Sequence, residues 1–117
     1  MSDLGDALEA QDAVRVAFAL RNGTVTVPLL PVDGPPQVRV FRRGDADKYM
    51  LLLFSSPETY AAMLPEEHEH PVAEYDAATL KDFLTTNLGV LEAVWFDVAG
   101  PYAMQAAPTD VLDALEL

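Results

Sequence analysis

The pattern of hydrophobic and polar positions is sharpest at residues 49–60. Met50 to Phe54 is an unbroken apolar run with the length of a strand that is buried on both faces. Ser56-Pro57-Glu58 then has the features of a helix start: an N-cap hydroxyl, a proline at the first helical position and a carboxylate near the positive helix end. The pattern predicts a central strand that leads directly into a capped helix over 57–64.

Before this segment, the pattern predicts one helix and two further strands. Residues 8–21 have helical periodicity, and the face expected to pack on the core carries Ala10, Val14, Ala17 and Phe18. β-Branched residues at 24–30 indicate a strand, and alternation at 38–42 indicates another with one face in water. Short turns join both strands to the central one, so we expect an antiparallel meander.

After this segment, helices and strands alternate. We expect a strand at 72–75, a helix from the N-cap Asp76 to Asn87, a buried strand at 91–98, a strand at 102–105 that pairs with it, and a last helix capped by Thr109. Strands that first meander and then alternate with helices predict an α+β fold. We expect a single domain over residues 1–117, with a mixed, largely antiparallel sheet of about five strands and about three to four helices.

Charge divides the chain into two unequal halves. Residues 1–48 carry six basic and seven acidic groups, residues 49–117 carry Lys81 against twelve acids, and the net charge is −12. This balance argues against nucleic-acid binding, which needs clustered Lys and Arg. The acidic excess is explained most simply by solubility. It also suits a protein partner with a basic surface, which it would attract.

Composition narrows the remaining classes of function. The chain has no cysteine, which excludes disulfides, thiolate metal sites and cysteine nucleophiles. Residues 1–6 are acidic and lack the regions of a signal peptide. No stretch reaches the ~18 apolar residues that span a bilayer, and no glycine-rich phosphate loop is present. We therefore expect a cytoplasmic protein with no membrane contact and no cofactor.

Glu66-Glu67-His68-Glu69-His70 is the cluster with metal-ligand chemistry. His68 and His70 would share one face of an extended segment, and imidazoles with carboxylates suit Zn²⁺ or Ni²⁺. Their spacing matches no established motif, however, and no third ligand is evident. A solvated acidic loop is the simpler interpretation, and the hypothesis of a metal-dependent enzyme rests on these two histidines alone.

The second candidate site is basic and consists of Arg39, Arg42, Arg43 and Lys48. We expect Arg15 and Arg21 in the same neighbourhood. Ion pairs with the acidic second half explain these side chains most simply. The alternative is a binding site for a small molecule, either an amino acid or an anion.

Ser55 and Ser56 follow the central strand, where a nucleophile could stand. The glycines of the Gly-x-Ser-x-Gly elbow are missing, so helix capping explains both serines better. The carboxylates also show no spacing that singles out a general acid–base pair. The sequence therefore predicts no catalytic residue, and we expect a protein that is not an enzyme.

Three short motifs follow one another in an order that resembles that of a known family. They are Val25-Thr26-Val27-Pro28-Leu29-Leu30, then Leu51 to Ser56 with Glu58, and then Trp95-Phe96-Asp97-Val98-Ala99-Gly100-Pro101. With a helix before them and a short helix after them, they resemble the amino-terminal domain of the SseB family, named for enhanced serine sensitivity in bacteria. Asp97-Val98 stands where the family pattern has Asn-Pro. The resemblance covers about residues 10–117 and implies a bacterial cytoplasmic protein of undefined molecular activity.

Two hypotheses of function follow. The first is a non-catalytic interaction or regulatory domain, whose partner is a protein with a basic surface. The second is a sensor domain that binds an amino acid or anion near the segment from Arg39 to Lys48. The sequence leaves the oligomeric state open.

Overall fold

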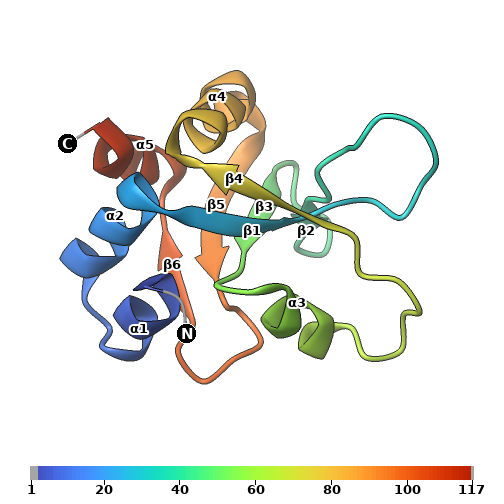
Figure 1. Ribbon diagram of the computed structural model, residues 1–117. Helices are drawn as coiled ribbons and strands as arrows, with labels where there is room; N and C mark the ends of the chain where they lie inside the picture. The colour runs from blue at the N-terminus through green and yellow to red at the C-terminus, as the bar shows by residue number, and fades with distance from the viewer. Residues whose placement is uncertain (1–2, 117) are drawn as a thin grey trace.

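The computed structural model describes residues 3–116, which form helices and strands in an α+β arrangement (Figure 1). The helices are α1 (Asp3–Glu9), α2 (Ala13–Asn22), α3 (Pro57–Met63), α4 (Ala77–Asn87), the short 3₁₀ helix η1 (Leu88–Val90) and α5 (Pro108–Glu116). The strands are β1 (Thr24–Pro28), β2 (Phe41–Arg42), β3 (Tyr49–Leu53), β4 (Val72–Asp76), β5 (Leu91–Phe96) and β6 (Met104–Ala106). The expected α+β class is confirmed.

The strands form two sheets rather than one. A four-stranded sheet has the order β2-β3-β5-β6, in which β3 and β5 are parallel and the two outer pairs are antiparallel. β1 and β4 form an antiparallel ribbon, which crosses in front of the four-stranded sheet in Figure 1. The ribbon is joined to the end of β3 by two backbone hydrogen bonds between Thr26 and Phe54, of 2.9 and 3.0 Å.

The expected meander is wrong. β1 pairs along its whole length with β4, and β2 is reduced to two residues that pair with β3. Between β1 and β2 the chain makes only an isolated bridge, from Leu29 to Val38. Prolines 31, 35 and 36 lie in this segment and have no N–H to donate to a ladder. β4 offers five residues that can pair without interruption, so β1 pairs there.

Two apolar clusters cover opposite faces of β3. The larger contains Leu51 and Leu53 and is closed by the β1–β4 ribbon and by α1, α2, α4 and α5. The smaller contains Leu52 and Phe54 and is closed in part by Tyr60 of α3. Residues 51–54 are therefore all buried, as the apolar run predicted.

The amino-terminal helix differs from the prediction in two ways. The expected helix over 8–21 is broken, because Gln11 adopts a positive φ of 53° and Asp12 caps a new helix by accepting from the backbone of Val14. The break resets the helical phase, so α2 packs a different stripe on the core: Val16, Ala19 and Leu20. Two residues of the expected core face, Val14 and Phe18, are instead 77% and 59% exposed.

Other helix ends depend on local chemistry. Ser56 caps α3 by accepting from the Thr59 backbone at 3.3 Å, and Asp76 caps α4 by accepting from Thr79 at 2.9 Å, as predicted. The last helix differs, because α5 begins at Pro108 and Thr109 lies inside its first turn. Within residues 3–116, no helix is long and apolar enough to cross a membrane.

The exposed face of α2 can be tested with two substitutions in one helix. Phe18→Ala should leave the free energy of unfolding within about 0.5 kcal/mol of the parent value, because this ring is mostly in water. Leu20→Ala should lower it by about 2–5 kcal/mol, because a buried side chain leaves a cavity. Urea unfolding followed by tryptophan fluorescence measures both. Equal losses would contradict the assignment of the buried face.

Candidate functional site

Arg39 is the centre of a polar cluster built from three separate segments of the chain. Its Nη1 and Nη2 donate to the two carboxylate oxygens of Glu67 at 2.9 and 3.1 Å, and Nη1 also donates to the hydroxyl of buried Tyr60 at 3.2 Å. The guanidinium lies over the ring of Phe41, 5.1 Å from its centroid. Arg39 therefore spends its donors inside the protein, where it ties the segment after α3 to α3 and β2.

The Arg39–Glu67 contact shifts both pKa values in the direction that favours the ion pair. The hydrogen bond from Arg39 lowers the pKa of Glu67 below its ordinary value, against the opposing effect of burial. The same bond raises the pKa of Arg39. A two-pronged contact of this kind is the strongest geometry for a guanidinium and a carboxylate. The expected pairing of a basic residue with the acidic half is thus present here.

The two histidines have different environments. The Nε2–H of His70 donates to the carbonyl of Leu64 at 2.6 Å, and its ring meets the ring of Tyr60 edge-on at 5.9 Å. His68 is exposed. Among the described residues, no three His, Cys, Asp or Glu side chains converge on one point. Metal binding by His68 and His70 stays a prediction, and it would use a histidine whose Nε2 is already engaged.

The other predicted basic residues lie on the β2–β3 hairpin. Arg42, Arg43 and Lys48 are exposed, and Arg43 makes a long contact of 3.4 Å from Nη2 to Oε2 of Glu92. Arg42 and Lys48 have no ion pair or side-chain hydrogen bond within residues 3–116. The hairpin brings these three residues together, whereas Arg39 belongs to the Glu67 cluster. Anion binding at the hairpin stays a prediction.

The expected proximity of Arg15 and Arg21 to this region is wrong. Both lie on α2, which Figure 1 shows on the opposite side of the molecule from β2. Arg21 donates to the carbonyl of Ala114 at 2.9 Å and thereby fastens α2 to α5. The physical reason is the β1–β4 ribbon, which carries the chain away from α2 before the basic segment begins.

Asp97 is a buried acidic residue that was not among the predicted site residues. It is 8% exposed and has a positive φ of 45°. Its carboxylate accepts from the backbone and hydroxyl of Ser55 at 2.8 and 2.7 Å, and from the hydroxyl of Thr59 at 3.3 Å. The sequence predicted a strand over 91–98 that would include Asp97, whereas β5 ends at Phe96 and Asp97 follows it directly. These bonds join the ends of parallel β3 and β5 to the start of α3.

The hydrogen bonds to Asp97 give Ser55 a structural role rather than that of a nucleophile. Its hydroxyl donates to a carboxylate, and Ser56 caps α3, so both serines have structural partners. The histidines of the chain lie on the loop between α3 and β4, with His70 turned to Leu64. The geometry therefore agrees with helix capping and strand joining at Ser55-Ser56.

The hydrogen bonds of Asp97 predict that substitutions at this position lower the free energy of unfolding to different degrees. Asp97→Ala removes the acceptor of the Ser55 bonds and places alanine at positive φ, so the free energy of unfolding should fall by about 1–3 kcal/mol. Asp97→Asn keeps one carbonyl oxygen and tolerates this backbone conformation, so its loss should be smaller. Urea unfolding gives both values. Losses of equal size would contradict this order.

The Arg39–Glu67 pair predicts a pH dependence. The pKa of Glu67 is lower in the folded state than in the unfolded chain, so the pair stabilises the fold above about pH 4.3 and loses this effect as pH falls. The melting temperature of Glu67→Gln should be lower than that of the parent at neutral pH, and the gap should narrow in acid. Glu66→Gln, which alters an exposed neighbour without an ion pair, is the control. A gap that does not change with pH would contradict the assignment.

Comparisons with known proteins add no relative. No protein-family model matches this chain, and no curated protein gives a significant match. The resemblance to the SseB family stays a prediction, and the function is inferred from the geometry of this chain.

Proposed function

We propose that this protein is a non-catalytic interaction or regulatory domain that binds a protein partner with a basic surface. The observation that carries the proposal is a set of carboxylates in the second half of the chain. They are exposed and have no ion pair or side-chain hydrogen bond within residues 3–116: Glu58, Glu66, Glu69, Asp82, Asp110 and Asp113. They lie on α3, α4, α5 and the loop before β4, so negative charge covers several elements.

The basic residues leave this charge uncompensated. Arg39, Arg43 and Lys81 are already paired, with Glu67, Glu92 and Glu116 respectively. Arg21 is engaged with a backbone carbonyl of α5. A surface of one sign raises the rate of association with an oppositely charged partner and weakens binding when salt is added.

Three buried polar groups have structural partners, which supports a non-catalytic domain. The hydroxyl of Thr26, fully buried, donates to Glu74 at 2.6 Å. Asp97 is held by Ser55 and Thr59, and the Tyr60 hydroxyl accepts from Arg39. Each of these groups holds two elements together, which is the ordinary task of a satisfied polar group in a core.

We further propose a relationship to the SseB family and a bacterial cytoplasmic location. The support is that the three motifs of the resemblance meet in space. Thr26 of the first motif exchanges backbone hydrogen bonds with Phe54 of the second, and Ser55 of the second donates to Asp97 of the third. Residues that are far apart in sequence thus form one joint, as motifs of a shared scaffold would.

Charge-neutralised variants test the interaction. Capture from a bacterial lysate at low salt should recover a basic protein with the parent chain, and the complex should dissociate as salt rises towards about 1 M, where charges are screened beyond about 3 Å. Neutralising Glu58, Glu66 and Glu69 to Gln, or Asp82, Asp110 and Asp113 to Asn, should weaken capture. The outcome is measured as the amount of partner retained at each salt concentration.

The matched control neutralises three exposed acids of the first half: Asp33, Asp45 and Asp47. It changes the net charge by the same amount and should leave capture nearly unchanged. If no basic partner is recovered at low salt, or if all three triple variants lose it equally, a specific acidic surface is not the binding site.

A further inference from the structure

The β1–β4 ribbon has one edge that is engaged and one that is open. On the outer side of β1, Thr26 exchanges two backbone hydrogen bonds with Phe54, of 2.9 and 3.0 Å. On the same side, the carbonyl of Pro28 accepts from the backbone N–H of Arg39 at 2.9 Å. Within residues 3–116 the ribbon is two-stranded, so no strand pairs with the outer side of β4. β4 is therefore an edge strand (Figure 1).

The strand register identifies the backbone groups that this edge leaves unpaired. Thr26 lies opposite Glu74, and Pro28 lies opposite Val72. In an antiparallel pair, two directly opposite residues point their backbone groups either both towards each other or both away. Thr26 and Pro28 point theirs away from β4, so Glu74 and Val72 point theirs away from β1. No hydrogen bond within residues 3–116 uses these outward groups, and Glu74 is exposed.

The outward groups match the backbone of an extended peptide. A strand presents an N–H and a C=O on one side at every second residue, which is the spacing from Val72 to Glu74. An added strand would therefore supply an acceptor for each outward N–H and a donor for each outward C=O. Extended peptides bind other sheets in this way, by adding a strand to an open edge.

The side chains on one face of this edge are acidic. Glu74 and Asp76 lie on the same face of β4, and both are exposed. The Glu74 carboxylate accepts from the uncharged hydroxyls of Thr24 and Thr26, at 3.2 and 2.6 Å. The Asp76 carboxylate accepts from the backbone of Thr79. Neither has an ion pair within residues 3–116, so no cation of this part of the chain neutralises them.

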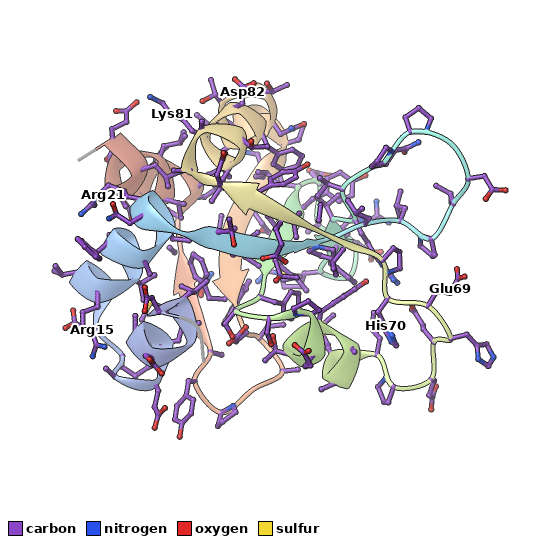
Figure 2. All side chains as sticks on the ribbon, in the orientation of Figure 1. Arg15, Arg21, Glu69, His70, Lys81 and Asp82 are labelled. Atoms are coloured by element: carbon purple, nitrogen blue, oxygen red, sulfur yellow. The ribbon has the colours of Figure 1, made fainter. Side chains whose placement is uncertain are left out.

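The segments on either side of β4 do not compensate this charge. Figure 2 shows Glu69 in the loop that leads into β4, and Lys81 on α4, which follows β4. Glu69 is exposed and has no ion pair among the described residues. Lys81 is already paired with Glu116 at 3.1 Å. The open edge thus combines unpaired backbone groups with negative charge.

We propose that the open edge of β4 binds an extended segment of the basic partner by strand addition, with basic side chains beside Glu74 and Asp76. Opposite charges on neighbouring strands stabilise their pairing. On the other face, the added strand would place its alternate side chains beside Ala73 and Tyr75, which are half-buried. A segment in which basic and apolar residues alternate suits both faces. The basic character of the segment rests on the proposed function, while the strand addition itself does not.

A second copy of this chain suits the edge less well. If β4 paired with β4 of another copy around a two-fold axis, the acidic residues of both strands would lie side by side. Like charges on neighbouring strands destabilise the pairing. Glu74 and Asp76 therefore disfavour self-association at this edge and favour a basic strand.

Hydrogen exchange of the whole protein, followed by NMR, tests the edge directly. In the free protein the N–H of Glu74 should exchange faster than those of Ala73 and Tyr75, which point to β1. The blocked peptide Lys-Val-Lys-Val-Lys, added at low salt, should slow the exchange of Glu74. At about 90% saturation only the free tenth of the protein exchanges, so the rate should fall about 10-fold. An unchanged Glu74 rate at saturating peptide overturns the proposal.

Two N-methylated peptides separate strand addition from simple charge attraction. One carries methyl groups on the backbone nitrogens of its lysines and the other on those of its valines, and both keep the same side chains. In a bound strand, one alternate set of N–H groups faces β4 and the other faces water. One peptide should therefore lose binding while the other keeps it. Equal affinities of the two peptides overturn strand addition, and this test needs no variant of the protein.

The charge of the edge is tested with Glu74→Gln, which keeps a carbonyl oxygen for the Thr26 hydroxyl. The loss of one cross-strand charge pair should weaken peptide binding about 2-fold to 5-fold. Glu9→Gln is the matched control, because Glu9 is exposed and lies on α1, away from β4 (Figure 1). It should bind the peptide as the parent does. Equal affinities of the two variants would contradict a basic segment beside Glu74.

The remaining outcomes distinguish the occupants of the edge and the two proposals. A dimer in light scattering whose Glu74 amide is protected overturns the basic segment in favour of a second copy. If a basic partner is captured but the Glu74 amide exchanges as fast in the complex as in the free protein, strand addition fails and the proposed function stands. If the peptide protects Glu74 but no basic partner is captured, the proposed function fails and the edge site stands.

Discussion

The parallel pairing of β3 with β5 is the constraint on which the rest of the structure depends. Parallel neighbours cannot be joined by a tight turn, so the chain must cross over between them, and it does so through α3, β4, α4 and η1. That crossover provides β4 as the partner of β1 and places α4 on the larger apolar cluster. The pairing also brings Ser55 and Asp97 together, because parallel strands end at the same edge of a sheet.

The distribution of charge depends on which of the few basic side chains are engaged within the fold. Arg39 and Arg21 hold segments together, through Glu67 and through the carbonyl of Ala114. Carboxylates that serve the fold do so as helix caps or as acceptors of buried donors, as at Asp76 and Asp97. The many acids left over face water, and they are in excess because the chain has nineteen acidic residues against seven basic ones. Glu92 differs from both kinds, since it is buried in part and only half satisfied.

The candidate sites were predictable to different degrees. Arg39 and His70 could be chosen by residue type, but their contacts with Glu67 and Leu64 depend on a loop that no local pattern describes. Asp97 was missed because the predicted strand ran to residue 98 and enclosed it, whereas β5 ends at Phe96. The bulge at Glu92 could not be predicted, since it is a shift in register between two strands that are about 40 residues apart in the chain. The chemistry of a side chain can be read from the sequence, whereas its burial and its partners depend on the folded structure.

The sequence by itself determined the class of fold, the buried central strand at 51–54 and the caps at Ser56 and Asp76. Each depends on interactions within a few residues: side-chain period, a hydroxyl or carboxylate at a helix start, and proline where no N–H is needed. Only the tertiary structure decided that β1 pairs with β4 and that α2 buries Leu20 rather than Phe18. In both cases the chain has two alternatives of similar composition, and only one of them is paired or buried. Both outcomes depend on long-range contacts, of β1 with β4 and of α2 with the larger apolar cluster, and those contacts exist only once the chain has folded.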